Sequence, residues 1–340
     1  MRAAAALWLV ALLALPAAAE SGRVLHRKVA AADGTALALY HYPPAEGGSG
    51  PAVLLVPELG FGRESFDLEG QGLARYLQGR GRDVFVAELR GQGQAASPAG
   101  WRLSQLMSDL NRVLDAIAAA RPGRVDLVVH GYGGGLLLAA CAGEAQGKVR
   151  RVVALAPAVW PEVPNAATEA LLKSGGGLHR LAERTGGADD FDLLFARNGK
   201  FSSAGRLTAL RKSVRDLDPA AAQELLAWMQ AGDLPLPDGT TLRGRFARYE
   251  RPTLVLLALR DNFAHPEFGA PLRERVPAAA AAKIEVELLT RLNLLSEDYT
   301  HLSLLHGASA PSEIFSRVQD FLAAPEPLPP GVQRAEDTVR

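Results

Sequence analysis

The chain has few residues that could cross-link it or hold a metal. It contains a single cysteine, Cys141, so no disulfide can form within the chain. Small apolar residues surround this cysteine, which favours a buried hydrophobic side chain over a reactive thiol. The seven histidines and the cysteine show no zinc-ligand spacing. We therefore expect no disulfide, no metal and no cofactor.

An excess of charge of one sign is also lacking. Acidic and basic residues number 37 each, and no basic stripe is visible, so nothing favours a nucleic-acid partner. No internal repeat is present. Apolar residues, in contrast, make up 48% of the 340 residues. This length and composition can supply one large α/β domain with an insertion.

The first residues have the pattern of a secretory signal peptide. Arg2 precedes an apolar run (3–15), which is followed by Pro16 and the alanines of an A-x-A site (17–19). The run is short for a membrane span, so we expect cleavage after Ala19 and no stable span in the mature chain. We therefore expect the mature protein to be exported to the periplasm or secreted. No cysteine follows the site, which argues against a lipoprotein anchor; an uncleaved N-terminal anchor is the alternative.

The mature chain alternates apolar runs with helical patterns. We expect a hairpin (24–30 and 36–42), then strands at 52–56, 83–88, 125–129, 149–156, 253–259 and 284–289. Helices are expected at 66–78, 103–120, 136–145 and 311–323. This order predicts an α/β fold with a mostly parallel, doubly wound sheet.

Residues 157–251 differ from the rest because they lack convincing strands. Helical patterns occur there at 167–173, 207–214 and 219–231, which predicts a helical cap inserted between two parts of the core (20–156 and 252–324). The final stretch (325–340) is rich in proline and charge, and we expect it to be a disordered tail.

Residues 124–143, RVDLVVHGYGGGLLLAACAG, are the most informative stretch. A β-branched run (125–129) breaks into glycines and resumes as Leu and Ala, which predicts a buried strand, a sharp corner (130–135) and a small-residue helix. The glycines precede a helix, but they lack the Lys-Ser/Thr of a P-loop and the G-x-G-x-x-G spacing. Nucleotide binding is therefore not expected.

Three further motifs accompany this corner. ELRGQG (88–93) follows one expected strand, TLVLLALRD ends in Asp261 after another, and DYTHLSLLHG (298–307) follows the last. With these motifs, the chain resembles the α/β-hydrolase fold family, in particular bacterial lipase- and esterase-like members with a helical cap. The resemblance implies that Asp261 is the acid and His301 the base of a catalytic triad.

The resemblance also implies a serine at the corner, the nucleophile elbow G-x-S-x-G. Here no register supplies Ser, Cys or Asp: alignment on the strand gives Gly131, alignment on the glycines gives Gly133, and an intermediate register gives Tyr132. Glycine tolerates the strained backbone of an elbow but has no reactive group. Tyrosine is a nucleophile in a few enzymes, but its phenol needs strong activation at neutral pH.

The oxyanion region departs from the family pattern as well. Members often have His-Gly after the first parallel strand, whereas this chain has Pro57-Glu58. The backbone N–H of Leu59 or Gly60 can still donate a hydrogen bond. An inward-pointing Glu58 carboxylate would repel a developing oxyanion.

Three functional hypotheses follow. The first is an exported hydrolase-fold protein without conventional serine-hydrolase catalysis, which binds a small apolar or ester-like ligand, or a protein partner, under the cap. The second is an active hydrolase of carboxyl esters or lipids that uses Tyr132 or a water activated by His301 and Asp261. The third is a structural envelope protein whose cap is the interaction surface.

Overall fold

The computed structural model describes residues 23–44, 48, 50–183, 195 and 200–325. The predicted signal peptide (1–19) lies outside these residues, as does nearly all of the predicted tail (325–340). Within the part of the chain that is described, no helix is both long and apolar enough to cross a bilayer.

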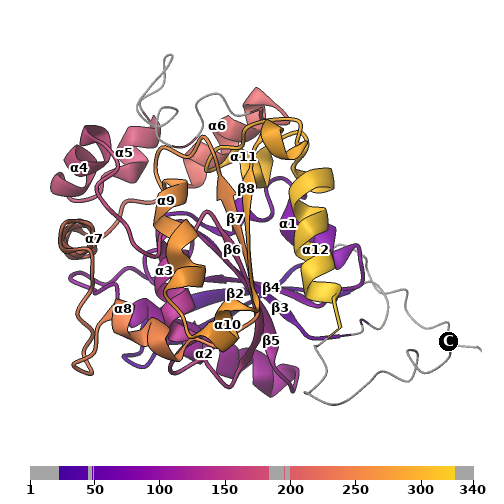
Figure 1. Ribbon diagram of the computed structural model, residues 1–340, viewed down its shortest axis with the longest axis horizontal. Helices are drawn as coiled ribbons and strands as arrows, with labels where there is room; N and C mark the ends of the chain where they lie inside the picture. Colours follow the sequence, from indigo (N-terminus) through magenta and orange to yellow (C-terminus); the bar gives the residue numbers. More distant parts are fainter. Residues whose placement is uncertain (1–22, 45–47, 49, 184–194, 196–199, 326–340) are drawn as a thin grey trace, which may run out of the picture.

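A single eight-stranded sheet forms the centre of the molecule (Figure 1). Its strands are β1 (Leu25–Ala30), β2 (Ala36–Tyr42), β3 (Val53–Val56), β4 (Val84–Glu88), β5 (Val125–His130), β6 (Val149–Leu155), β7 (Thr253–Ala258) and β8 (Ile284–Leu289). They are ordered β1-β2-β4-β3-β5-β6-β7-β8. β1 and β2 pair antiparallel and β2 pairs antiparallel with β4, whereas all other pairs are parallel. The predicted mostly parallel α/β sheet is confirmed.

Helices cover both faces of the sheet. Figure 1 shows α2 (Gln105–Ala120) and α3 (Gly131–Ala140) on one side, and α1 (Leu73–Gln78) and α12 (Ser316–Ala323) on the other. Alternate residues of the central strands point to opposite faces, so Leu54 joins the apolar cluster under α2 and α3, and Leu55 joins the cluster under α1 and α12. The strands are buried on both faces, which explains their continuous apolar sequences.

The described part of the segment between β6 and β7 is helical. It contains α4 (Ala166–Lys173), α5 (Leu178–Glu183), α6 (Ala204–Ser213), α7 (Pro219–Ala231), α8 (Leu242–Arg245) and a short 3-10 helix (Phe246–Arg248). Helix α7 is delimited by its sequence: the Asp218 side chain accepts from the Ala220 N–H, Pro219 is in the first turn, and Gly232 ends the helix in the left-handed conformation.

The remaining elements after β7 are short. They are α9 (Pro266–Gly269), a 3-10 helix (Ala270–Glu274), α10 (Ala278–Ala281), a 3-10 helix (Arg291–Asn293), α11 (Ser303–His306) and a π-helical turn (Pro311–Phe315) that leads into α12. The closing helix expected at 311–323 is therefore one π turn followed by α12.

Two expected helices have different bounds in the structure. The helix expected at 66–78 begins only at Leu73, because Glu69, Gly70 and Gly72 have positive φ and Leu68 pairs with Gln71 in a tight turn. The central helix was expected at 136–145 but spans Gly131–Ala140. The predicted glycine corner is in fact the first turn of α3, since small residues allow the helix to start directly where β5 ends.

Candidate functional site

Four segments that directly follow parallel strands meet at one edge of the sheet. They follow β3, β5, β7 and β8, and they contain Glu58, Gly131, Asp261 and His301 respectively. Ligand sites of open α/β sheets lie at this edge. The residues predicted from sequence at the elbow, the acid position and the base position are therefore brought together.

The structure resolves the register of the elbow. β5 ends at His130, and Gly131 is the first residue of α3, with φ at +61°. A left-handed residue between a strand and a helix is the position that the family gives to its nucleophile. Tyr132 and Gly133 follow it within the first turn of α3. Of the three registers considered, alignment on the strand is therefore the one realised, with Gly131 at the apex.

The Glu58 side chain fills the space beside this apex. Its carboxylate is fully buried and accepts three backbone N–H groups. Oε1 accepts from Leu59 at 2.5 Å and from Gly133 at 3.1 Å, and Oε2 accepts from Tyr132 at 2.6 Å. In the α/β-hydrolase fold, the oxyanion hole consists of the N–H that follows the nucleophile and an N–H from the loop after the first parallel strand. Here these two donors, from Tyr132 and Leu59, both bind Glu58.

The loop that holds Glu58 is fixed by the ELRGQG motif. The Gln92 side-chain amide donates to the carbonyl oxygens of Pro57 at 2.8 Å and Glu58 at 3.2 Å, while its own oxygen accepts from the Leu89 N–H at 2.7 Å. The carboxylate also lies at the N-terminus of α3, where the helix dipole stabilises negative charge. Both features hold Glu58 inward.

Asp261 and His301 form a buried hydrogen-bonded pair. His301 Nδ1 lies 2.7 Å from Asp261 Oδ2, and both side chains are inaccessible to solvent. The other carboxylate oxygen of Asp261 accepts from the N–H groups of Phe263 at 2.9 Å and Ala264 at 2.8 Å. An acid held by backbone donors and bonded to a histidine ring is the arrangement that orients the base in a catalytic triad.

The free ring nitrogen of His301 points to Glu58. Nε2 lies 3.7 Å from Glu58 Oε2, and no hydrogen bond reaches Nε2 from any residue that the structure describes. His130 stacks on the His301 ring with centroids 4.3 Å apart, and its Nε2 lies 3.2 Å from the His301 carbonyl oxygen. Glu58, His301 and Asp261 are thus arranged in the order of a triad, with a carboxylate where the serine hydroxyl would be.

Burial and charge set the protonation of these groups. Burial raises the pKa of Glu58 to about 6, although the charge of His301 and the three backbone N–H groups favour its ionised form. For His301, burial opposes the charged form, but the charge and hydrogen bond of Asp261 and the charge of Glu58 outweigh it and raise the pKa. Burial lowers the pKa of His130 well below its ordinary value, and a charged His301 lowers it further. His130 is therefore a neutral packing partner.

Two other sequence predictions have defined places in the structure. The Tyr132 hydroxyl donates to the carbonyl oxygen of Phe263 at 2.8 Å, and burial raises its pKa well above the ordinary value. Gly60, expected as a possible oxyanion donor, is not among the residues that bind the Glu58 carboxylate. Its carbonyl oxygen instead accepts from the Arg215 N–H at 2.7 Å.

Sequence reasoning identified Glu58 as an obstacle to catalysis but not as the residue that occupies the donors. The sequence feature that could have indicated this contact is the joint presence of Glu in the oxyanion loop and Gly at the elbow. Sequence reasoning also missed the aromatic wall around His301, where the rings of Phe263 and Phe195 lie 5.4 Å and 5.6 Å from the imidazole, centroid to centroid. These rings belong to segments far apart in the sequence, and no local sequence pattern predicts that they pack around the same imidazole.

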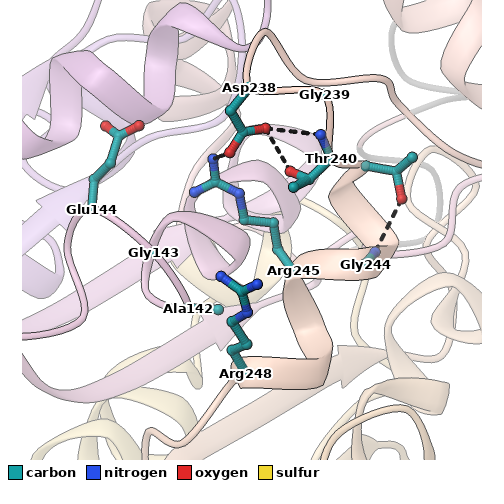
Figure 2. A pocket seen from close by; sticks show the side chains of 10 residues that line it. Ala142, Gly143, Glu144, Asp238, Gly239, Thr240, Gly244, Arg245 and Arg248 are labelled. Atoms are coloured by element: carbon teal, nitrogen blue, oxygen red, sulfur yellow. Dashed lines mark hydrogen bonds and ion pairs between the residues drawn. The ribbon is translucent and has the colours of Figure 1, made fainter.

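A surface pocket of about 500 Å³ lies apart from this site, between the C-terminal end of α3 and α8 (Figure 2). Two of its four charged residues are paired: Asp238 binds Arg245 at 2.6 Å and also accepts from the Thr240 N–H at 3.0 Å and hydroxyl at 2.6 Å. None of the residues of the Glu58–His301–Asp261 group lines it. Among the described residues, no cluster of His, Cys, Asp and Glu is suited to a metal ion.

Comparison with solved structures shows the same fold in bacterial hydrolases. An esterase from Thermogutta terrifontis superposes with a TM-score of 0.57 at 17% identity, covering 88% of this chain and 98% of that one. The enol-lactonase from Burkholderia xenovorans LB400 gives 0.58 at 20% identity, covering 88% and 100%. An esterase from Exiguobacterium antarcticum gives 0.59 at 17% identity, covering 88% and 100%. At these identities the likeness concerns the fold.

Among curated protein sequences, none matches the chain. The family model described as serine aminopeptidase, S33, matches residues 60–287, which is more than half of the chain. The matched region includes the elbow at Gly131 and the acid position at Asp261. The sheet order, the strand-to-helix elbow and this match agree, and the chain belongs to the S33 serine aminopeptidase family of α/β-hydrolases.

Proposed function

We propose that this protein is an exported member of its family that does not use serine acyl-enzyme chemistry and instead binds a small apolar or ester-like ligand, or a protein partner. The observation that supports this proposal most directly is the Glu58 carboxylate, which binds the N–H groups of Leu59, Tyr132 and Gly133. Donors that already hold an anion are not available to a reaction intermediate.

Acyl transfer needs a nucleophile and an empty oxyanion hole. Gly131 offers no reactive atom, and His301 therefore has no hydroxyl to deprotonate. An ionised Glu58 would repel the negative charge that develops on an attacked carbonyl oxygen, most strongly where water is excluded. The two departures reinforce each other, because either one alone would lower the rate of the conventional reaction.

The proposed ligand class follows from the surroundings of the dyad. The aromatic side chains of Phe195 and Phe263 and the buried side chain of Leu59 face this region, so an apolar molecule would meet few unpaired polar groups there. Export is proposed from the pattern of the first 19 residues. The periplasm or the extracellular space would be the place of action.

The test is an esterase assay of the chain from Glu20 to Arg340 with p-nitrophenyl esters of short to long acyl chains. A fluorophosphonate probe, which labels activated serines, is run in parallel. We expect no labelling and turnover no higher than that of His301→Ala. Turnover that disappears in His301→Ala would overturn the proposal.

The second candidate is a hydrolase that uses Tyr132 or a water activated by the His301–Asp261 pair. The intact hydrogen bond between these two residues favours it, because the second half of a triad is preserved at 2.7 Å. The bond from the Tyr132 hydroxyl to Phe263 and its raised pKa argue against tyrosine as the nucleophile. The water route needs a water within reach of His301 Nε2. A comparison of His301→Ala with Tyr132→Phe in the same assay separates the two routes.

A further inference from the structure

A group of arginines lies at the edge of the sheet opposite the candidate site, near the amino ends of the parallel strands. Two adjacent hollows of about 390 Å³ and 400 Å³ share Gly50, Pro51 and Arg150 in their walls. The first is also lined by Arg121 and Arg124, and the second by Arg80 and Arg82. No lining residue of either hollow is acidic, although Arg121 of the first hollow is ion-paired with Asp83 at 2.8 Å. A concave surface with charge of one sign concentrates ions of the other sign.

Arg82 is the most informative of these arginines because it is buried. The residue is 6% exposed, and its only hydrogen bond within the described chain runs from Nε to Gln319 Oε1 at 3.4 Å. Its two terminal nitrogens therefore lack an acceptor from the described residues. Because Arg82 lines the second hollow, water or a bound anion there can accept hydrogen bonds from these nitrogens.

The carboxylate whose charge acts on Arg82, that of Asp126, is hydrogen-bonded to another residue. Both oxygens of Asp126 bind Arg150, with Nε to Oδ1 at 2.7 Å and Nη2 to Oδ2 at 2.6 Å. The charges of Arg82 and Arg151 also act on Asp126, so three guanidinium groups share this one carboxylate. Burial lowers the pKa of Arg82, and the attraction of Asp126 is opposed by the charge of Arg150. Arg82 therefore has no carboxylate hydrogen-bonded to it among the described residues.

Arg80 extends this charge to the surface. Its guanidinium lies over the Tyr76 ring, 3.5 Å from the centroid, and it makes no ion pair with any described residue. The stacking fixes the orientation of the side chain without neutralising it.

We propose that the hollow lined by Arg80, Arg82 and Arg150 binds a phosphate-type oxyanion, either inorganic phosphate or the phosphomonoester group of a larger molecule. Guanidinium groups match the spacing of phosphate oxygens and bind them through paired, charge-assisted hydrogen bonds. A bound phosphate supplies the acceptors that Arg82 lacks and balances the excess charge. A hollow of about 400 Å³ has room for a phosphate group and for part of a larger molecule that carries it.

The proposal is tested by titration calorimetry of the chain from Glu20 to Arg340 with inorganic phosphate at constant ionic strength. The variants are Arg82→Gln and Arg80→Gln, and the matched control is Arg273→Gln, an exposed arginine outside both hollows that makes no ion pair with a described residue. Arg80 is exposed, so Arg80→Gln remains informative if Arg82→Gln does not fold. Sedimentation with phosphatidylcholine vesicles, with and without phosphatidic acid, tests whether the phosphate belongs to a lipid.

We expect phosphate binding by the unaltered chain and by Arg273→Gln, with Kd about tenfold weaker in Arg82→Gln, as the loss of one charge-assisted hydrogen bond predicts. Arg80→Gln should also weaken binding. Sedimentation that depends on phosphatidic acid assigns the site to a lipid headgroup, and phosphate binding without it assigns the site to a soluble phosphate. No phosphate binding together with no dependence on phosphatidic acid, or equal affinity in all four proteins, overturns the proposal.

Discussion

Glu58 Oε2 lies 1.5 Å from the position that a Cβ atom on Gly131 would occupy. No side chain can therefore exist at the elbow while Glu58 keeps its present conformation. The two residues are 73 positions apart in the sequence, yet the presence of each explains the presence of the other. The glycine leaves room for the carboxylate, and the carboxylate gives the N–H groups at the start of α3 their acceptor.

This relationship predicts that Gly131→Ser alone will not create an active hydrolase. The new side chain would collide with Glu58, and overpacking of a buried site typically costs about 1–3 kcal/mol of unfolding free energy. Serine would also have to adopt the left-handed conformation of Gly131, at φ +61°. We expect a lower midpoint in urea unfolding and no labelling by a fluorophosphonate. A stable, labelled Gly131→Ser protein would show that Glu58 moves aside readily.

The double variant Gly131→Ser/Glu58→Ala is expected to gain esterase activity. Removal of the carboxylate clears the space for the introduced hydroxyl near His301 Nε2 and frees the N–H groups of Leu59 and Tyr132 for an oxyanion. Fluorophosphonate labelling and hydrolysis of p-nitrophenyl acetate measure the gain. Addition of His301→Ala should lower the rate by about 10²–10⁴-fold, the usual contribution of a general base. A double variant that folds but stays unlabelled would contradict the equivalence of Glu58 and the missing hydroxyl.

Glu58→Ala alone is expected to destabilise the chain and to bind small carboxylates. Three buried N–H groups lose their acceptor, and each unsatisfied group costs about 1–3 kcal/mol unless water enters. Formate or acetate should restore part of the loss, because each can place a carboxylate in the vacated space. The rise in melting temperature with added formate is the measurement, and Glu144→Ala, which alters an exposed acid, is the control. An equal rise in both variants would count against a specific site.

The sequence was sufficient to predict the sheet and to predict that Asp261 and His301 lie together. Buried parallel strands have continuous apolar sequences. Asp261 and His301 follow β7 and β8, in the chain order that the family has for its acid and histidine. The start of α3 was not predictable in this way. A run of glycines gives no periodicity, so the corner expected at 130–135 could not be distinguished from the first turn of a helix.

The direction of the Glu58 side chain could not be predicted from the sequence either. Whether a carboxylate after β3 points to solvent or inward depends on three donors, two of which belong to α3, and on Gln92, which holds the loop. The contacts with Gln92 and α3 join segments that are 34 to 75 residues apart. Local sequence patterns indicate the hydrophobic periodicity of a segment and the residues that form its turns. They do not indicate which distant backbone groups its side chains will contact.

Tyr132→Phe is expected to affect stability and not catalysis. The hydroxyl donates to the buried carbonyl oxygen of Phe263, and loss of such a hydrogen bond typically costs about 0.5–1.5 kcal/mol. The phenyl ring keeps its edge-on contact with Phe263, whose centroid is 4.9 Å away. Urea unfolding measures the loss, and the ester assay should give the same values for the two proteins. Any ester turnover that depends on the hydroxyl would favour the tyrosine route.

The stability that Glu58 contributes should depend on pH in a predictable direction. Its pKa is raised from 4.5 to about 6 in the folded chain, so between these values the folded chain binds a proton that the unfolded chain has released. This contribution is fully present below pH 4.5 and is lost as the pH rises through about 6. The shift corresponds to about 2 kcal/mol. His301 acts in the same sense, because its raised pKa gives stability below pH 6.5 that is lost at higher pH.

The difference in unfolding free energy between the unaltered chain and Glu58→Gln reports the titration of Glu58 together with its effect on His301, and other titrating groups cancel. Because the glutamine cannot ionise, the unaltered chain should lose stability relative to Glu58→Gln as the pH rises from 4.5 to about 7. Glu144→Gln, which removes an exposed carboxylate, should leave the profile parallel to that of the unaltered chain. A difference that stays constant across this range would mean that Glu58 titrates as an ordinary carboxyl group and that its burial beside His301 has no energetic consequence.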